Sequence, residues 1–507
     1  MTKVGLNRRM FLKAAAAVGS TVGFAPSRLL GGPPCRSVPL SNGDLQLLSN
    51  SLSDPSGLVL PTDSSFGTAK LLYNRNLGIP DPTFIVKARS TEDVVNTVNW
   101  CREREINPRI RSGGHSYAGY SSGATVVLDL REMNGVENDG DGVSAIDAGA
   151  NLGQVYAGLR CDEQRSLPSG TCAGVGISGI STAGGFGFHM REHGLTLDRV
   201  EKAEVVLANG DVVMASNKPD EHPDLFWALL GGGSGSYGVV TRWWFNTIEF
   251  EDLSRATGNW DWNDLPQVFA AWQEWITTLP NEVYVNLITR VNPGSAPSFL
   301  VQAIGPNRKG VDLVALVEDL ASQSGVPTSD KVVKTDISWW PTPCPANPVR
   351  GSIYGLRKSR LSEAAVSDDA MLGLMANFED RLKNEDLHAT SGKVILDALG
   401  GAVAERASDA TSWVHRDARF CSQFITNWNS MPESQSAADE NQAWLRRSYD
   451  EFAPYCNRGC YQGYWDADIV DWPDLYYGEN FPRLREVKTA YDPENFFRFQ
   501  RSIPPLG

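Results

Sequence analysis

The chain has 507 residues, of which 41% are hydrophobic and 21% are charged, and its formal net charge is -14. This composition is that of a globular protein and excludes a disordered chain, a collagen and a polytopic membrane protein. The acidic balance argues against a nucleic-acid partner, because backbone phosphates are bound through Lys and Arg. Eight cysteines in a chain of this length are too few for a disulfide scaffold.

The first 25 residues are predicted to be a targeting signal. Arg8 and Arg9 precede Met-Phe-Leu-Lys and an Ala-rich apolar stretch that runs to about Ala25, which is a twin-arginine pattern. The stretch is shorter than the roughly 20 apolar residues of a membrane span, so no stable span is expected. We expect the twin-arginine export machinery to carry a folded protein, often one that already holds a cofactor, to the periplasm or out of the cell. A basic, disordered N-terminus is the alternative.

The remaining chain divides into a linker and three regions that differ in composition and in predicted secondary structure. Residues 26–69 are rich in Pro, Ser and Gly and are interpreted as a linker and N-terminal extension. Strands and helices then alternate to about residue 245, with expected strands at 83–87, from 107 and at 125–130, and a helix over 94–103. From about 250 to 415, Trp-rich amphipathic stretches such as 260–275 alternate with strands such as 284–290. Two extended aromatic segments follow Trp413.

Three glycine-rich segments lie within about 130 residues, at 111–117, 169–187 and 231–240. Consecutive glycines let backbone amides converge on an anion such as a pyrophosphate, so the segments suggest a long ligand that lies against the backbone. Residues 174–179 match G-x-G-x-x-G, but no hydrophobic strand precedes them, and we reject a nicotinamide fingerprint. For His115, inside the first segment, a tight turn with a surface histidine remains the alternative.

These segments carry a resemblance to a known family. Arg-Ser-Gly-Gly-His at 111–115, Cys-Ala-Gly-Val-Gly at 172–176 and Gly-Gly-Phe-Gly at 184–187 resemble the flavin domain of the vanillyl-alcohol-oxidase superfamily. The tail at 491–498 with Ser-Ile-Pro-Pro at 502–505 resembles the berberine-bridge-enzyme branch, which includes glucooligosaccharide oxidases, aclacinomycin oxidoreductase and cannabinoid synthases.

The resemblance implies an α+β fold. It predicts a two-subdomain PCMH-type FAD-binding domain at residues 70–250 and a substrate domain at 251–455, in which helices cover an antiparallel sheet. A C-terminal berberine-bridge-type segment at 456–507 is expected to return to the FAD domain.

The same resemblance implies a covalent cofactor. His115 matches the residue bonded to the 8α carbon of FAD, and Cys172 matches a second tether to flavin C6, where a thiolate is the better nucleophile. A buried, inert thiol is the alternative for Cys172. Val175 matches the position at which oxygen-reactive members carry Val, which favours an oxidase with O2 as acceptor. Further FAD contacts are expected from Ser112, Gly113, Gly114, Ser116, Gly176, Gly179, Val240 and Asn495.

Catalytic roles also follow from the resemblance. Residues 461–466 resemble a family strand whose second tyrosine is the base, which assigns the base to Tyr464 and keeps Tyr461 in reserve. Gln423 is the expected neighbouring active-site residue. Because tyrosine has a pKa near 10, it is a poor base unless its phenolate is stabilised, and Tyr117 is a candidate for helping. The chain departs from the family pattern at Ile180, Phe186 and Gly463.

Three other features have competing interpretations. His189 and His193 are four residues apart, but no third ligand is evident, so no metal site is expected. Cys456 and Cys460 allow a disulfide that the sequence cannot decide. The tryptophans at 260, 262, 272 and 275 line a sugar site or belong to the core.

The leading hypothesis is an exported flavoprotein oxidase. It oxidises an alcohol or hemiacetal carbon of a small-molecule carbohydrate or glycosylated metabolite and reduces O2 to H2O2. The alternative is a tailoring oxidase that acts on a C–H or C–N centre of an alkaloid or polyketide. A binding protein that has lost catalysis is a third possibility, against which Tyr464 and Gln423 argue.

Overall fold

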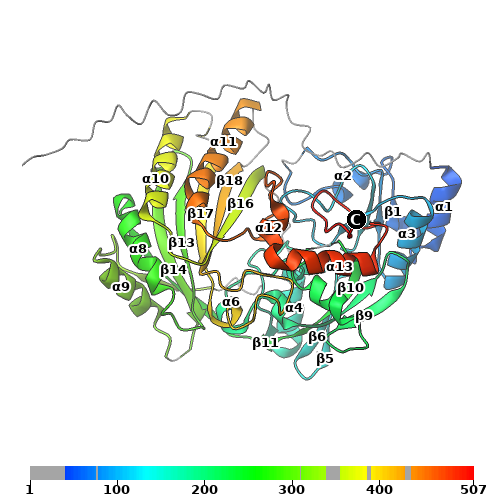
Figure 1. The fold of residues 1–507 in the computed structure, drawn as a ribbon, viewed down its shortest axis with the longest axis horizontal. Helices are drawn as coiled ribbons and strands as arrows, with labels where there is room; N and C mark the ends of the chain where they lie inside the picture. The colour runs from blue at the N-terminus through cyan, green and yellow to red at the C-terminus, as the bar shows by residue number, and fades with distance from the viewer. Residues whose placement is uncertain are drawn as a thin grey trace, which may run out of the picture. The chain divides into compact units, whose positions relative to one another are not determined.

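The computed structural model describes residues 40–75, 78–233, 235–308, 310–337, 354–384, 387, 390–428 and 435–507. The predicted signal at residues 1–25 and its cleavage site lie outside these ranges. The described residues all belong to one compact unit, Cys35–Gly507, whose elements are labelled in Figure 1. Among the described helices, none combines the length and the apolar character that crossing a bilayer requires.

The linker interpretation of residues 26–69 is wrong for its described part. Helix α1 (Asn42–Ser51) begins with a capping box, in which the Ser41 side chain accepts from the Asp44 N–H and the Asp44 carboxylate accepts from the Ser41 N–H. Trp100 Nε1–H donates to the Asp44 carbonyl at 3.0 Å and joins α1 to helix α3 (Thr91–Glu103). Strand β1 (Leu58–Val59) and helix α2 (Phe66–Ala69) follow within the same segment.

A four-stranded sheet carries the first glycine-rich loop. Helix α3 (Thr91–Glu103) begins at Ser90, whose hydroxyl accepts from the Asp93 N–H at 3.2 Å, as the cap chemistry predicts. The pairs β2–β4 and β4–β3 run parallel and β1–β2 runs antiparallel. In sheet order the strands are β1, β2 (Phe84–Lys87), β4 (Val126–Asp129) and β3 (Arg109–Arg111).

A second sheet of five antiparallel strands follows and carries the other two glycine-rich segments. Its order is β5 (Val136–Gly140), β6 (Val143–Asp147), β10 (Val239–Asn246), β8 (Val200–Val206) and β9 (Val212–Ser216). A short ladder pairs β7 (Arg165–Ser166) with β11 (Ile248–Glu249). The helices of this region are α4 (Leu152–Glu163), α5 (Ile177–Ser181), α6 (Met190–His193) and α7 (Pro223–Leu229).

The third sheet has seven strands, all antiparallel, and forms the second half of the molecule. Its order is β15 (Val333–Asp336), β12 (Leu253–Trp260), β14 (Ser298–Pro306), β13 (Tyr284–Val291), β17 (Ser391–Ala398), β18 (Phe420–Trp428) and β16 (Tyr354–Ser362). Figure 1 shows the helices packed against it, which are α8 (Leu265–Trp275), α9 (Leu313–Ser324), α10 (Asp368–Lys383) and α11 (Gln435–Phe452).

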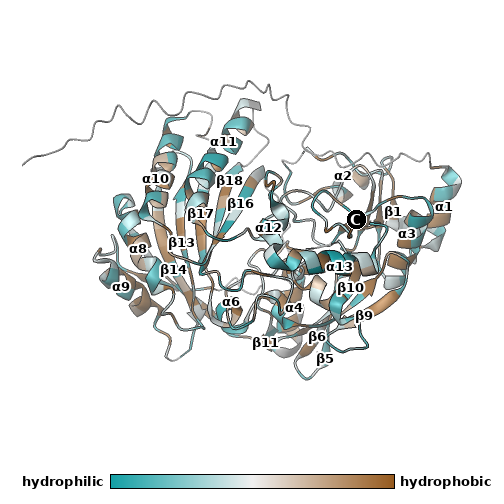
Figure 2. Ribbon diagram, in the orientation of Figure 1, coloured by the Kyte–Doolittle hydropathy of each residue, from teal (hydrophilic) through white to brown (hydrophobic). Residues whose placement is uncertain are grey.

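The two faces of this sheet have different surroundings. Phe420 and Phe424 of β18 are fully buried in a core that also contains Trp272 of α8 and Trp444 of α11. In Figure 2 the strands carry much of the brown, hydrophobic colour, whereas α10 and α11 are largely teal. Because side chains alternate along a strand, Gln423 points to the opposite face, away from these helices. The predicted α+β class, with helices covering an antiparallel sheet, is confirmed.

The C-terminal segment packs on the first half of the chain. Helix α12 (Trp472–Tyr477) leads to α13 (Phe481–Tyr491), which contacts α7. Lys488 Nζ donates to Asp492 and to the Phe497 carbonyl. The Asn107 amide donates to the Phe496 carbonyl at 2.8 Å, which fastens the tail beside β3.

Residues 461–466 do not form the expected strand. They contain a 3-10 helix, Gln462–Tyr464. A Cβ built on Gly463 would lie 2.4 Å from the Tyr461 ring. The absence of a side chain at Gly463 therefore allows the Tyr461 ring to pack against the Gly463 backbone. In a strand these two positions would point to the same face some 6–7 Å apart, since the rise is about 3.3 Å per residue.

Candidate active site

One cavity of about 480 Å³ gathers most of the predicted site residues. Such a volume is within the usual range of small-molecule sites. Its walls come from all three glycine-rich segments, from the face of the seven-stranded sheet opposite the helices, and from residues 461–465 and 498–499. Of the predicted residues, those that line it are Ser112, Gly113, Gly114, His115, Ser116, Tyr117, Cys172, Gly176, Gly179, Val240, Gln423, Tyr461 and Tyr464.

Asn495 does not line the cavity. It lies in the turn after α13, with a left-handed φ of 52°, and its N–H donates to the Asp492 carbonyl at 3.0 Å. Asn tolerates this conformation better than most residues, so the turn accounts for its backbone. Its Oδ1 is buried without a hydrogen-bond partner among the described residues, and its role in FAD binding stays a prediction.

The first two glycine-rich segments pack backbone against backbone. A Cβ on Gly113 would lie 2.3 Å from the Gly176 nitrogen, and a Cβ on Gly176 would lie 2.1 Å from the Gly113 nitrogen. The hydroxyls of Ser112 and Ser178 both donate to the Ala148 carbonyl, at 2.7 and 2.8 Å. Glycine is therefore required at both positions, and the segments form a single wall.

His115 is held as a neutral imidazole. Its ring stacks on Tyr73 with centroids 3.6 Å apart, and its buried Nε2 has no hydrogen-bond partner among the described residues. Burial, followed by the Arg357 charge, lowers the pKa of His115 to about 3. An unprotonated ring nitrogen without a partner inside a cavity is suited to bonding an electrophilic carbon.

Cys172 lies on the neighbouring segment and opens into the cavity. The two segments touch beside it, since a Cβ on Gly174 would lie 3.9 Å from His115 Cδ2. Partial burial raises the pKa of the Cys172 thiol, while the charges of Arg357 and Lys393 act in the opposite direction. The free thiol, the unpartnered His115 nitrogen and the paired glycine walls all fit a covalently held FAD.

The tyrosines occupy different environments. Tyr461 stacks on Phe186 with centroids 4.0 Å apart, and its hydroxyl accepts from the Gly185 N–H at 2.9 Å. Tyr464 is partly exposed to the cavity, with its ring 4.9 Å from Tyr461 and 5.9 Å from Tyr117. The geometry therefore favours Tyr464 and Tyr117 over Tyr461 as groups that can meet a substrate.

Neighbouring charges affect the pKa values of Tyr464 and Tyr117 differently. Burial raises the pKa of Tyr464 well above its usual value, and the Asp397 charge raises it further. Burial also raises the pKa of Tyr117, but the Arg357 charge and hydrogen bonds with Arg357 and Gln423 oppose that rise. A phenolate is thus better stabilised on Tyr117.

Sequence reasoning missed Tyr73, Arg357 and Lys393 among the lining residues. Tyr73, which stacks on His115, follows the Pro- and Ser-rich segment and belongs to no motif. Arg357 and Lys393 lie on β16 and β17, in the region that the resemblance does not cover. Alternation along these strands was the available signal, but it does not say which face meets a ligand. All three departures from the family pattern, Ile180, Phe186 and Gly463, line the cavity, as does Val175.

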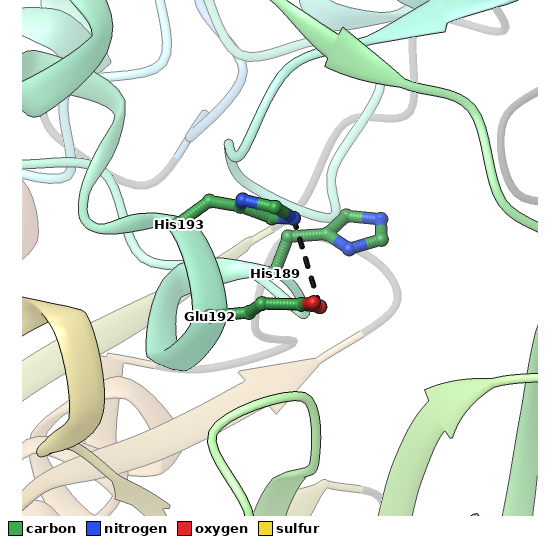
Figure 3. A group of neighbouring side chains, drawn as sticks. All are labelled: His189, Glu192 and His193. Atoms are coloured by element: carbon green, nitrogen blue, oxygen red, sulfur yellow. Dashed lines mark ion pairs between the residues drawn. The ribbon is translucent and has the colours of Figure 1, made fainter. Parts of the chain in front are cut away.

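The histidine pair is joined by a third ionisable group (Figure 3). The ligand atoms of His189, Glu192 and His193 all lie within 4.8 Å of one another. The Glu192 carboxylate is already paired with Arg308 at 2.9 Å and lies 3.6 Å from His193. Burial, and then His193, lowers the pKa of His189 to about 4. Because the Glu192 carboxylate is already paired with the Arg308 guanidinium, we assign no metal ion to this group.

Two open questions from the sequence are answered. Cys456 and Cys460 are free and buried, so they do not form a disulfide. Trp260, Trp272 and Trp275 are buried in the core between the seven-stranded sheet and its helices, against which Trp262 also packs, and none lines the cavity. The tryptophans are core residues.

Comparisons with known proteins agree with this site. The family described as FAD binding domain matches residues 82–216, and the family described as berberine and berberine like matches residues 460–504. The uncharacterized FAD-linked oxidoreductase YgaK of Bacillus subtilis (strain 168) is 33% identical over 461 residues, covering 89% of this chain and 97% of its own.

Sugar oxidases are among the similar proteins. Glucooligosaccharide oxidase of Sarocladium strictum is 29% identical over 460 residues, covering 84% of this chain and 88% of its own. The solved structure of the xylooligosaccharide oxidase from Myceliophthora thermophila C1 in complex with xylobiose has a TM-score of 0.79 at 25% identity, covering 92% of this chain and 99% of its own. By its fold, its cavity and these relatives, the chain belongs to the berberine bridge enzyme-like family of FAD-linked oxidases.

Proposed function

We propose that this oxidase acts outside the cytoplasm on an alcohol or hemiacetal carbon of a carbohydrate or glycosylated metabolite, with O2 reduced to H2O2. The observation that carries the proposal is the meeting, in one cavity, of two potential flavin tethers with a tyrosine pair. His115 and Cys172 lie on touching loops, and Tyr117 and Tyr464 lie within the same cavity. The similarity to glucooligosaccharide and xylooligosaccharide oxidases supports a sugar as the substrate class.

In this proposal His115 and Cys172 hold FAD through two covalent bonds. Ser112, Gly113, Gly114, Ser116, Gly176, Gly179 and Val240 are the proposed backbone and side-chain contacts of the cofactor. When bound, FAD supplies the two-electron acceptor for the substrate and passes those electrons to O2. Two tethers prevent loss of the cofactor after export.

The chain's own residues handle the proton. Tyr464 is the proposed base because it is partly exposed to the cavity, whereas the Tyr461 hydroxyl is engaged by the Gly185 N–H. Tyr117 is the alternative base, since Arg357 and Gln423 oppose the rise in its pKa. Gln423, which hydrogen-bonds Tyr117, is proposed to orient that hydroxyl toward the substrate.

A peroxide assay on a substrate panel tests the proposal. Holoenzyme is mixed in air with mono- and oligosaccharides, glycosylated metabolites, and alkaloid and polyketide alcohols, and H2O2 is measured. We expect peroxide from members of the sugar group. Turnover confined to the alkaloid or polyketide compounds would favour a tailoring oxidase, and a yellow protein inactive with all of them would favour a binding protein.

Export is tested separately. Replacing Arg8 and Arg9 by Lys should retain the precursor in the cytoplasm, because the twin-arginine machinery reads that pair. Fractionation followed by immunoblotting measures the distribution. Export at the level of the unaltered protein would contradict the assigned route.

A further inference from the structure

The wall of the active-site cavity carries one sign of charge. Among the residues that the structure describes, four Arg or Lys side chains line it and no Asp or Glu does, although the whole chain has a formal net charge of -14. Arg109 and Arg498 lie at the side formed by β3 and the C-terminal tail. Arg357 and Lys393 come from the seven-stranded sheet, and their charges act on Cys172.

Strand register puts Arg357 and Lys393 on one face of the sheet. Arg357 of β16 lies opposite Ile425 of β18, and Lys393 of β17 lies opposite the same Ile425. Residues directly opposite each other in antiparallel strands share a face, and neighbouring strands are about 4.8 Å apart, so the two backbones lie roughly 10 Å from each other. Both side chains are long enough to converge over Ile425.

The Arg357 guanidinium is fixed in place by neutral groups. It donates to Asn427 Oδ1 at 2.6 Å and to the carbonyls of Leu356 and Thr426 at 2.8 and 3.1 Å. It lies 5.2 Å from the centre of the Tyr117 ring. Arg357 is only 9% exposed and pairs with no carboxylate among the described residues.

The Lys393 ammonium has no hydrogen bond or ion pair with any residue that the structure describes. Burial and then the Arg357 charge lower the pKa of Lys393, and the charges of Cys172 and Asp397 oppose this only in part. Two other buried lysines are neutralised: Lys358 by Asp466 at 2.7 Å and Lys488 by Asp492 at 2.6 Å. Asp397, four residues along β17, is the acidic side chain whose charge acts on Lys393, but the two form no ion pair. An arriving anion that pairs directly with both cations would therefore lower the cost of keeping two like charges together.

The position of the pair assigns the anion to the substrate side. Arg357 contacts Tyr117. Gln423 precedes Ile425 by two residues on β18, so the two side chains lie on the same face of the sheet. The backbone amides of the glycine-rich loops lie on the other wall and suit the phosphates of a dinucleotide. A charged group held over Ile425 would therefore lie beside the tyrosines.

We propose that the substrate of this enzyme carries a carboxylate, which Arg357 and Lys393 bind while the carbon to be oxidised faces Tyr117 and Tyr464. The inference rests on the proposed function and narrows its substrate class to sugar acids, of which uronic acids are the simplest. A hydroxy acid that is not a sugar presents the same carboxylate and is the other source of this chemistry.

Matched pairs of substrates test the charge alone. Holoenzyme is assayed for H2O2 with D-glucuronate and D-glucuronamide, which differ by one charge, and with mandelate and mandelamide as the non-sugar pair. We expect kcat/KM for glucuronate to exceed that for glucuronamide by about 10–100-fold, the usual contribution of a hydrogen bond between charged groups. If the enzyme prefers the acid only in the mandelate and mandelamide pair, the proposed carboxylate site stands. The substrate class is then a hydroxy acid that is not a sugar.

Substitution of Lys393 ties the preference to this site. Lys393→Gln should lower the glucuronate-to-glucuronamide ratio by at least about 10-fold, because the amide substrate loses no charge interaction. Arg290→Gln is the control, since Arg290 lies opposite Lys393 on β13 but is exposed and outside the cavity. Arg290→Gln should leave the ratio unchanged. Arg357 is a less clean target because it also contacts Tyr117.

Binding without turnover separates this inference from the proposed function. Methyl β-D-glucuronide has no free anomeric hydroxyl, and its binding is followed through the visible flavin spectrum under nitrogen, with methyl β-D-glucoside for comparison. If the glucuronide binds in a Lys393-dependent way but no sugar is oxidised, the carboxylate site is supported and the proposed function is contradicted. If neutral sugars are oxidised with no preference for the acid, the proposed function is supported and the carboxylate site is contradicted.

One further result would overturn the inference. If Lys393→Gln lowers turnover of glucuronate and glucuronamide equally and shifts the flavin midpoint potential, the cations serve the cofactor and not the substrate. We expect the potential to be the same in Lys393→Gln and Arg290→Gln.

Discussion

The two walls of the cavity are built in different ways. On the glycine-rich side, the functional residues come in short runs, at 112–117 and 172–180, and backbone atoms form much of the surface. On the sheet side, they are dispersed over residues 357–427 and share a face only because of strand register. The first wall is specified by local sequence and the second by the pairing of distant strands.

Because of this difference, we expect the two walls to tolerate amino-acid substitutions to different degrees. Where Gly113 and Gly176 touch, any side chain would push the loops apart. On the sheet, Arg357, Lys393 and Gln423 project from a scaffold whose core lies on the other face. The cofactor wall should resist substitution, whereas the substrate wall should accept it and change specificity. The following predictions test that contrast, beginning with the largest effect.

Removing both tethers should free the cofactor completely. In His115→Ala and Cys172→Ala each protein keeps one bond, and only the double variant should release its flavin. Acid precipitation followed by absorbance of the supernatant measures the released flavin. Free flavin from the unaltered protein would show that neither bond forms, and complete release from one single variant would show that the other tether is misassigned.

Removing the base should slow flavin reduction by substrate about 10²–10⁴-fold, the usual contribution of general base catalysis. Stopped-flow reduction under nitrogen compares Tyr464→Phe with Tyr117→Phe, and Tyr461→Phe is the matched control. If Tyr117→Phe has the larger effect, the Arg357 charge has decided which tyrosine takes the proton. An effect confined to Tyr461→Phe would contradict the geometric argument.

Adding one methyl group to the cofactor wall should damage the fold. Gly113→Ala puts a Cβ 2.3 Å from the Gly176 nitrogen, and overpacking of this kind lowers the free energy of unfolding by about 1–3 kcal/mol. Gly67→Ala, which would meet nothing within 4 Å, is the control. Denaturant unfolding and the flavin content per chain measure both variants. Equal stability of the two would mean that the loops separate freely.

A pH-dependent effect, confined to a narrow pH range, concerns Asp397 on the substrate sheet. Burial raises its pKa to about 6, above the unfolded value near 4, so the folded state binds the extra proton. Its contribution to stability is present below about pH 4 and is lost as the pH rises through 6. Asp397→Asn should therefore gain stability over the wild type between pH 4 and 7, by at most about 3 kcal/mol, when urea unfolding is measured.

A carboxylate with the opposite shift provides the control. Ion pairs with Arg446 and Lys358 hold the pKa of Asp468 below its usual value in spite of burial. Asp468→Asn should lose stability relative to the wild type as the pH rises through the range where the unfolded carboxyl ionises. Parallel pH profiles for Asp397→Asn and Asp468→Asn would contradict both assignments.

The sequence predicted the half of the site that is local. His115, Cys172 and their glycines stand in continuous motifs, so their meeting in one cavity could be expected. Helix α1 was missed because the Ser41–Asp44 capping box stands in a segment rich in Pro, Ser and Gly. The strand expected at 461–466 was wrong because Gly463 permits a tight turn that a larger residue would not.

Arg357 and Lys393 could not have been found in this way. Their proximity depends on a shared neighbour, Ile425, on the strand between them. No spacing in the chain encodes that relationship, since a shift of one residue in either pairing would turn one side chain to the helix-covered face. Side-chain charge on a sheet becomes informative only once the register is known.

The attachment of the C-terminal tail has a consequence for biosynthesis. Trp465, Arg498 and Phe499 line the cavity, and the Phe496 carbonyl is held by Asn107. The cavity wall is therefore incomplete while residues 496–499 are still inside the ribosome. A chain threaded across a membrane during translation would have its first half outside before this closure, whereas a protein exported after release can complete the pocket, and load it, inside the cell.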